Sequence, residues 1–388
     1  MIKVLVVDDS VVVRRLIVDS LGGMPDIEVV GTASNGLLAQ AKIDSLRPDV
    51  ITMDIEMPQM DGIQAVRELR KRHRTPVIMF STLSAAGASA TLEALSAGAT
   101  DYVTKPSNVG SIAQSIAAVR EQLVPKIHAL AGRRPPAGRP GPGPAPSRPG
   151  LAPPPLHRPG LARPGEQAPG RPAAPPVKAV RRGGPQQRVD ILAIGSSTGG
   201  PDALTKVLQA MPTELPVPIV VTQHMPPVFT RMFAERLDRS TPLRVVEAGD
   251  GMELTAGTVY IAPGDKHLVL QRRGTATLTQ LSGAPPENSC RPAVDVMFRS
   301  VSSLYGASVF ATVLTGMGYD GRSGAKVLRD AGAEVLAQDE ASSVVWGMPG
   351  AVVGAGLADE VLPLDRIAAA LIQRVQVGRA PRATAVTR

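Results

Sequence analysis

The feature that most constrains the fold of this chain is a segment without hydrophobic periodicity, residues 133–188. Its 56 residues contain 17 of the 37 prolines, ten arginines and one lysine, but a single acid, Glu166. A segment of this composition cannot bury enough apolar surface to offset the chain entropy that is lost on ordering. We therefore expect a disordered Pro/Arg-rich linker between two parts of the chain that fold separately.

The linker also explains the basic character of the chain. The whole chain has a formal net charge of +8, and the segment carries eleven cations and one acid, a net +10, so the remaining residues total −2. The segment has no aromatic side chain that could stack on bases. We interpret it as a solvated spacer and expect no nucleic-acid partner; a nucleic-acid-binding arm is the alternative.

Cysteine content and hydropathy bear on the location of the protein. Cys290 is the one cysteine, so no intramolecular disulfide can form, which fits a reducing compartment. The apolar run at residues 4–7 ends at Asp8, and the uncharged stretch 341–358 contains four glycines and a proline. Neither reads as a signal peptide or a membrane span. We expect a cytoplasmic protein without direct membrane insertion.

Residues 1–124 alternate between short apolar runs and longer amphipathic runs. We predict strands at 3–7, 27–33, 50–53, 77–80 and 101–104, and helices at 10–21, 36–46, 62–73, 84–97 and 110–123. Five successive β/α units predict a doubly wound parallel sheet with helices on both faces. Sites in such sheets form beyond the carboxyl ends of the strands.

Polar side chains follow four of these predicted strands. They are Asp8 and Asp9, Asp54, Ser81 and Lys105, in chain order. Any one of them alone is read as an ordinary loop residue, but together they converge on one edge of the sheet. Three carboxylates repel one another unless a cation is present, and oxygen ligands suit magnesium. A carboxylate beside a metal ion and a lysine can attack a phosphoryl group.

These residues stand in the strings VLVVDDS, DVITMDIEMPQMDG, MFST and GATDYVTKP. Through them residues 1–124 resemble the receiver domain of response regulators. The resemblance implies a flavodoxin-like fold, a histidine kinase as phosphodonor, and a cis bond between Lys105 and Pro106. The site residues it implies are a phosphorylated Asp54, a Mg²⁺ site of Asp8, Asp9, Asp54 and the backbone oxygen of Glu56, and the switch residues Ser81, Tyr102 and Lys105.

A second strand–helix alternation begins at residue 189. A predicted strand, 189–194, leads through GSSTGGP into a predicted helix, 201–211. The glycines permit a sharp turn, and Ser197 lies inside it as the serine of a G-x-S-x-G string. This string is weak evidence by itself, because a phosphate-binding loop or a plain turn would also explain it.

Two further residues strengthen a catalytic interpretation of Ser197. His224 follows a predicted strand, 218–222, and Asp320 lies in the turn TGMGYDG between a strand, 308–314, and a helix, 323–331. A serine, a histidine and an aspartate at one sheet edge predict a nucleophile, a base and an orienting acid.

The chain order of this set, Ser-His-Asp, differs from that of α/β-hydrolases, in which the acid precedes the histidine. An α/β-hydrolase arrangement would need His267 with an acid such as Asp250 or Asp265. His267 lies in IAPGDKHLVL, which predicts a β-hairpin region. We interpret it as structural or substrate-contacting.

The second part also contains the strings IGSSTGGPDAL, VTQHMPPVFTRMFAERL, GTVYIAPGDKHL, RPAVDVMF, VLTGMGYDGRSGA and AQDEASSVVWGMPGA. Through them it resembles the catalytic domain of the CheB family, the protein-glutamate methylesterases of bacterial chemotaxis. The resemblance implies a Rossmann-like Ser-His-Asp esterase domain that needs no cofactor and has the backbone amide of Met317 as an oxyanion donor. Chemoreceptor cytoplasmic helices are the implied substrate, and deamidation of glutamine is a second implied activity. Two positions depart from the family pattern: Cys290, where histidine is common, and Tyr319, where asparagine is frequent.

The sequence thus predicts a receiver domain at 1–124, a linker at 125–188, a methylesterase domain at 189–375 and a flexible basic tail at 376–388. We expect the unphosphorylated receiver to cover the groove that leads to Ser197. One alternative is a serine esterase or amidase acting on another substrate. The other is a non-catalytic output domain that binds a partner or DNA, although a DNA-binding output would call for a small helix-turn-helix module.

Overall fold

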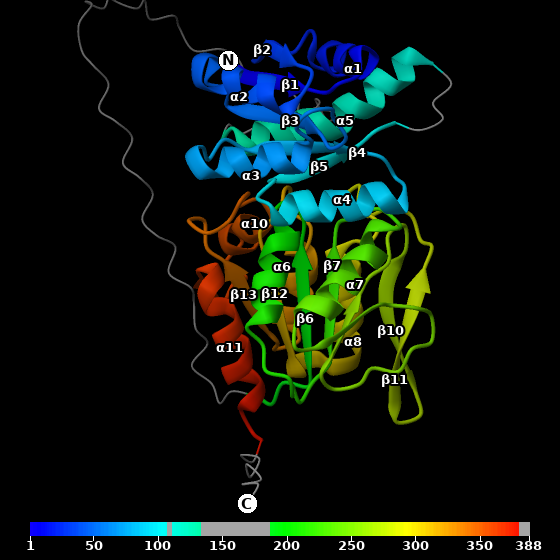
Figure 1. The fold of residues 1–388 in the computed structure, drawn as a ribbon. Helices are drawn as coiled ribbons and strands as arrows, with labels where there is room; N and C mark the ends of the chain where they lie inside the picture. The colour runs from blue at the N-terminus through cyan, green and yellow to red at the C-terminus, as the bar shows by residue number, and fades with distance from the viewer. Residues whose placement is uncertain (107–110, 133–186, 380–388) are drawn as a thin grey trace, which may run out of the picture.

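The computed structural model describes residues 1–106, 111–132 and 187–379 (Figure 1). They form two α/β units, each built on its own parallel sheet, and this confirms the predicted fold class. Most of the predicted linker, residues 133–186, lies outside the described residues. So does the predicted tail from residue 380 onward.

The first unit is a five-stranded parallel sheet in the order β2-β1-β3-β4-β5. Its strands are β1 (Ile2–Val7), β2 (Ile27–Ala33), β3 (Val50–Asp54), β4 (Val77–Ser81) and β5 (Asp101–Thr104). Its helices are α1 (Val11–Leu21), α2 (Gly36–Leu46), α3 (Gly62–Arg72), α4 (Ala85–Ser96) and α5 (Ile112–Leu130). Each of these five helices begins after a Ser, Asn or Asp side chain that accepts a backbone hydrogen bond. Such N-cap residues mark helix starts in a sequence.

Helix α5 corrects one predicted boundary. We expected the helix to end at residue 123 and the linker to begin at 125, but α5 continues to Leu130 with Pro125 inside it. Proline removes one helical hydrogen bond. Val119, Leu123 and Ile127, spaced by four residues, are nevertheless all fully buried against the sheet. Because packing of this apolar face outweighs the lost hydrogen bond, the first unit extends beyond residue 124.

The second unit is a seven-stranded parallel sheet in the order β14-β13-β12-β6-β7-β9-β8. Its strands are β6 (Ile191–Ser196), β7 (Ile219–Gln223), β8 (Arg244–Glu247), β9 (Thr258–Ile261), β12 (Val309–Val313), β13 (Glu334–Gln338) and β14 (Glu360–Leu362). The antiparallel hairpin of β10 (His267–Arg273) and β11 (Ala276–Ser282) packs beside it, where the sequence predicted a hairpin region.

Helices cover both faces of this sheet. The helices are α6 (Gly200–Gln209), α7 (Phe229–Ser240), α8 (Val294–Tyr305), α9 (Arg322–Asp330), α10 (Met348–Gly354) and α11 (Leu364–Gln376), with a 3₁₀ turn, η1 (Gly306–Ser308). Buried residues of α6, α7 and α11 belong to one hydrophobic cluster, and those of α8, α9 and α10 to the other. The sheet is therefore doubly wound.

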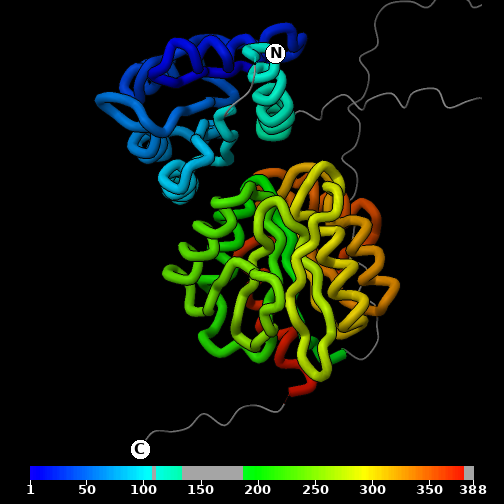
Figure 2. The backbone as a smooth tube through the Cα atoms, turned by 90° about the vertical axis from the view of Figure 1, so that its right-hand side faces the viewer, coloured from blue at the N-terminus to red at the C-terminus, as the bar shows by residue number. Residues whose placement is uncertain are grey.

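The first unit sits on the second at the edge where the strands of the second sheet end (Figures 1 and 2). Helix α4 packs on α6 and α7, and Arg236 of α7 donates to the Ser96 hydroxyl of α4 at 2.5 Å. Among the helices that the structure describes, none combines the length and apolar character that crossing a membrane requires.

Candidate active site

Three side chains that the sequence singled out lie at the carboxyl edge of the second sheet. Ser197 follows β6, His224 follows β7, and Asp320 stands in the loop after β12. These strands are neighbours with β6 in the middle, so the chain winds away from β6 in both directions. Sites in doubly wound sheets form at such a switch point. The fold therefore brings the three residues to one edge of the sheet.

Asp320 holds one nitrogen of the His224 imidazole. The ring Nε2 lies 2.8 Å from Asp320 Oδ2, and the carboxylate also accepts backbone amides from Val294 (2.7 Å), Asp295 (3.0 Å) and Gly321 (3.0 Å). Although burial opposes ionisation of Asp320, the bonds from His224 and the amides lower its pKa below the ordinary value. An ionised acid can only accept, so Nε2 carries hydrogen and Nδ1 is left as the base nitrogen.

The base nitrogen of His224 faces a residue that the sequence reasoning did not place in the catalytic set. Nδ1 lies 3.5 Å from Sγ of Cys290. Within the described ranges no hydrogen bond joins Ser197 to His224. Burial lowers the pKa of His224, but Asp320 and Cys290 raise it to about 10. The one sequence signal for this contact was the departure from the family pattern at position 290.

Ser197 lies in a turn that glycines make possible. Gly199 has a φ of 75°, in the left-handed region, and is the N-cap of α6. Gly316 of the loop after β12 lies so close that a Cβ there would meet the Cβ of Ser197 at 2.9 Å. The backbone amide of Met317, the next residue of this loop, has no hydrogen-bond partner among the residues described. It is therefore free to bind an oxygen.

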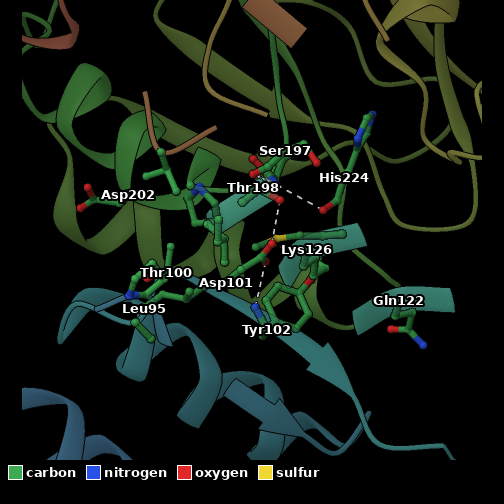
Figure 3. Close-up of a pocket in the computed structure, with 18 of the residues that line it drawn as sticks. Leu95, Thr100, Asp101, Tyr102, Gln122, Lys126, Ser197, Thr198, Asp202 and His224 are labelled. Atoms are coloured by element: carbon green, nitrogen blue, oxygen red, sulfur yellow. Dashed lines mark hydrogen bonds and ion pairs between the residues drawn. The ribbon is translucent and has the colours of Figure 1, made fainter. Parts of the chain in front are cut away.

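Both units line a pocket of about 820 Å³ that includes Ser197 and His224. The second unit contributes Ser197, His224 and Cys290, and the first contributes Asp101 and Lys126, among others. Figure 3 shows the residues of β5 and α5 facing those that follow β6 and β7. The first unit therefore covers the approach to the candidate nucleophile.

Buried contacts of β5 hold this cover in place. Asp101 Oδ2 accepts a hydrogen bond from Thr198 Oγ1 at 2.7 Å and pairs with Lys126 Nζ at 2.5 Å. The rings of Tyr102 and Phe229 stack with centroids 4.9 Å apart and an interplanar angle of 8°. Asp101 and Thr198 are only 5% and 4% exposed, so this polar contact is shielded from water. It lies one residue from Ser197.

At the carboxyl edge of the first sheet, Asp8, Asp9 and Asp54 bring ligand atoms within 4.8 Å of one another. Lys105 Nζ lies 2.7 Å from Asp54 Oδ1 and 3.6 Å from Asp8 Oδ2, and Glu56 lines a small neighbouring pocket with Asp9. Asp8 is fully buried, its Oδ2 has no hydrogen-bond partner, and burial together with the Asp54 charge raises its pKa to about 6. An oxygen-seeking divalent cation would satisfy this orphaned atom, so the residues fit Mg²⁺.

The sequence-predicted switch residues are distributed between this edge and the interface. The Ser81 hydroxyl accepts a bond from Thr91 Oγ1 at 2.6 Å and lies 3.1 Å from the Gly87 carbonyl, so α4 engages it. Tyr102 is the buried interface residue described above. The implied cis bond between Lys105 and Pro106 is wrong, because that bond is trans, the lower-energy isomer of such bonds.

His267 has a structural environment. It is fully buried at the start of β10, where Nδ1 accepts from the Ala293 amide at 3.2 Å and Nε2 lies 3.1 Å from the Pro285 carbonyl. The acids of the α/β-hydrolase alternative have other partners, since Asp250 accepts the Leu281 amide and Asp265 pairs with Arg291. The alternative triad is therefore not assembled.

Comparison with known proteins gives matches over both units. The CheB methylesterase family matches residues 192–371, and the response regulator receiver domain matches residues 4–117. A protein-glutamate methylesterase/protein-glutamine glutaminase of Nocardioides sp. is 52% identical over 375 residues, covering 96% of this chain and 95% of the relative. Its counterpart in Trichodesmium erythraeum is 44% identical over 378 residues, covering 96% and 99%. The crystal structure of the Thermotoga maritima CheB methylesterase catalytic domain matches with 44% identity and a TM-score of 0.47, covering 48% of this chain and 99% of that one.

Proposed function

This chain belongs to the CheB methylesterase family and carries a receiver domain before the methylesterase domain, and from this premise we propose that it is a phosphorylation-activated protein-glutamate methylesterase. The observation that supports the proposal most directly is that Ser197, His224 and Asp320 lie at one sheet edge. The receiver unit lines the pocket that contains Ser197 and His224. A DNA-binding output is not favoured, because the second unit is an α/β fold with a crevice at its switch point.

The substrate is a methyl ester of a glutamate side chain on the cytoplasmic helices of chemoreceptors. Relatives of this chain bear the double name protein-glutamate methylesterase/protein-glutamine glutaminase. A glutamine amide presents the same carbonyl to the same nucleophile, so deamidation of receptor glutamines is the second activity. A histidine kinase supplies the phosphoryl group to Asp54.

In the first half of the reaction the Ser197 oxygen attacks the ester carbonyl carbon. Its proton passes to Nδ1 of His224, the ring nitrogen that Asp320 does not use. The negative charge that develops on the carbonyl oxygen is stabilised by the free amide of Met317. The carbon–oxygen bond to the methoxy group then breaks, and His224 returns the proton to the departing oxygen, which leaves as methanol.

In the second half a water molecule attacks the acyl-serine and gives a proton to His224. The bond between Ser197 and the acyl carbon breaks, the serine oxygen takes that proton back, and a free glutamate side chain leaves. Asp320 keeps the imidazole in the tautomer that both steps need and stabilises the imidazolium that forms between them. With glutamine as substrate the leaving group is ammonia.

Regulation works through the cover that the receiver places over Ser197. Asp54 accepts the phosphoryl group. Asp8, Asp9 and Asp54 with the backbone oxygen of Glu56 would hold Mg²⁺, which would supply positive charge to offset that of the phosphoryl oxygens. Ser81 and Lys105 bind these oxygens. The Ser81 hydroxyl donates to the Gly87 carbonyl of α4 in this structure. When it turns to the phosphoryl group this bond breaks, which changes how α4 is held against α6 and α7.

The test is methanol release from methylated receptor membranes. Full-length protein with Mg²⁺ and a small-molecule phosphodonor releases methanol, and Ser197→Ala does not. Glutamine-bearing receptors release ammonia with the same dependence on Ser197. Release by Ser197→Ala equal to that of the wild type would refute the proposed function. Hydrolysis of small esters without release from receptors would leave an esterase of another substrate.

A further inference from the structure

The position of Cys290 against His224 is not used by the mechanism above. Asp320 is an acceptor only, so it fixes hydrogen on Nε2 of His224 and leaves Nδ1 as the one nitrogen that can take the Ser197 proton. That nitrogen lies 3.5 Å from the Cys290 sulfur, within sulfur hydrogen-bonding distance. The nucleophile and the thiol therefore need the same atom of the histidine.

A tight turn directs the thiol to this place. Glu287 and Cys290 exchange backbone hydrogen bonds of 3.1 and 2.9 Å. The two residues between them, Asn288 and Ser289, have φ values of 52° and 61°, a left-handed conformation that is rare for residues other than glycine. Such strained backbone persists only where surrounding contacts hold it.

Those contacts are present on both sides of the turn. The Glu287 carboxylate pairs with Arg299 at 2.5 to 2.8 Å, and Asn288 Nδ2 donates to the carboxylates of Asp295 and Asp320, each at 2.9 Å. The turn is therefore tied to the same aspartate that orients the imidazole. Cys290 and the ring of His224 are fixed relative to each other by one common anchor.

We propose that Cys290 is a positioning residue that restrains the esterase reaction: its sulfur occupies Nδ1 of His224 and must release this nitrogen before Ser197 can use it. The inference rests on the proposed function, since it assigns Nδ1 the role of base. Sulfur is a weak hydrogen-bond partner, so substrate binding displaces it at small cost. A stronger partner at position 290 would hold the base more firmly.

Proton occupancy of the ring supports this restraint. Asp320 faces Nε2, Cys290 faces Nδ1, and the receiver residues that share the pocket, Asp101 and Lys126, pair with each other. Burial lowers the pKa of His224, but Asp320 and Cys290 raise it to about 10. At neutral pH the ring is then held protonated, with Nδ1–H directed at sulfur. Removing the Cys290 thiol therefore lowers the pKa of His224 and frees Nδ1 to act as the base.

The experiment compares the pH profile of methanol release by full-length protein, activated with Mg²⁺ and phosphodonor, for wild type, Cys290→Ala and Cys290→Ser. We expect Cys290→Ala to raise kcat at neutral pH about 2- to 10-fold, with KM unchanged. In Cys290→Ala the midpoint of the alkaline rise moves to lower pH. In Cys290→Ser, whose hydroxyl is a stronger hydrogen-bond partner for Nδ1 than the thiol, kcat does not rise and the midpoint does not fall. Ser289→Gly is the matched control: glycine adopts the left-handed conformation of this turn residue without strain, so the turn keeps its shape and the midpoint stays unchanged.

A gain in kcat together with a lower midpoint separates restraint from a purely structural role, because damage to the fold or loss of the receiver cover would not by itself move the titration of His224. An unchanged or lower kcat of Cys290→Ala with an unmoved midpoint overturns the proposal. The imidazole of His224 is also titrated by NMR without substrate, where Cys290→Ala must lower its midpoint. This second readout remains decisive if receptor membranes yield no methanol, which would be a failure of the proposed function alone.

Discussion

The two sheet edges of this molecule use aspartate in opposite ways. In the first unit Asp8 is buried with an oxygen that has no hydrogen-bond partner, although Lys105 Nζ lies 3.6 Å away, and the pKa of Asp8 is raised to about 6. In the second unit Asp320 accepts bonds from His224 and from several amides, and its pKa is lowered. The acids of the first edge need additional positive charge, which a bound cation can supply. At the second edge the hydrogen bonds to Asp320 are already complete, and no cation is needed. An aspartate at the carboxyl edge of a parallel sheet can thus serve a switch when its hydrogen bonds are incomplete and a catalytic site when they are complete.

The largest expected effect on activity comes from the catalytic residues at the carboxyl edge of the second sheet. Ser197→Ala and His224→Ala each lower methanol release by more than about a thousandfold, because the serine and the base share every bond-making step. The double variant is little worse than either single variant. Steady-state release with the fold checked by circular dichroism measures this, and additive losses would show that the two residues do not act as one unit.

A smaller loss is expected for the acid. Asp320→Asn lowers kcat by about 10²- to 10⁴-fold, because the amide no longer favours hydrogen on Nε2 and places an NH₂ group against amide donors. Asp295→Asn changes the neighbouring buried acid, which does not touch His224, and is the matched control. Equal losses in the two variants would reduce Asp320 to a structural role.

The next effect has the opposite sign and concerns the cover between the units. Asp101→Ala removes the buried bond to Thr198 and raises the activity of the unphosphorylated protein by about 5- to 150-fold. Asp202→Ala is the control, because Asp202 lines the same pocket but pairs with Lys206 within its own helix. An Asp101→Ala protein as slow as the wild type would show that this contact does not restrain the enzyme.

The smallest expected effect concerns Asp8 and the response of the first sheet to Mg²⁺. A raised native pKa means that the folded Asp8 binds protons more tightly than the unfolded one, so stability falls as pH rises from about 4 to 6 without Mg²⁺. Hydrogen exchange of the β1 and β3 amides at pH 7 therefore slows on addition of Mg²⁺, by up to about tenfold. Asp8→Asn removes the buried charge and abolishes this response. A metal response that survives in the variant would place Mg²⁺ elsewhere.

The sequence predicted most of what each edge contains, because strand-end residues of parallel sheets converge whatever the details of packing. Ser197, His224 and Asp320 could be grouped because each of them follows a predicted strand. The α5 extension was missed, since burial of Ile127 overrides the helix-breaking tendency of Pro125.

Contacts that depend on how loops and units pack could not be predicted. The Cys290 thiol contacts His224, which is 66 residues away in the sequence. The turn that places the thiol has two residues in the left-handed conformation, which the sequence does not predict. The bond between Asp101 and Thr198 spans 97 residues and exists only because the units dock. No local pattern encodes either contact.

The receiver covers the esterase site, and we propose that phosphorylation of Asp54 lifts this cover. The direct measurement is the ratio of methanol release with and without phosphodonor, at constant Mg²⁺, for full-length wild type and Asp54→Ala. We expect a rise of about 5- to 150-fold for the wild type and no rise for Asp54→Ala, which stays at the low basal rate. A wild-type rate that does not respond to phosphodonor, or an Asp54→Ala rate that rises equally, would show that phosphorylation of Asp54 does not lift the cover.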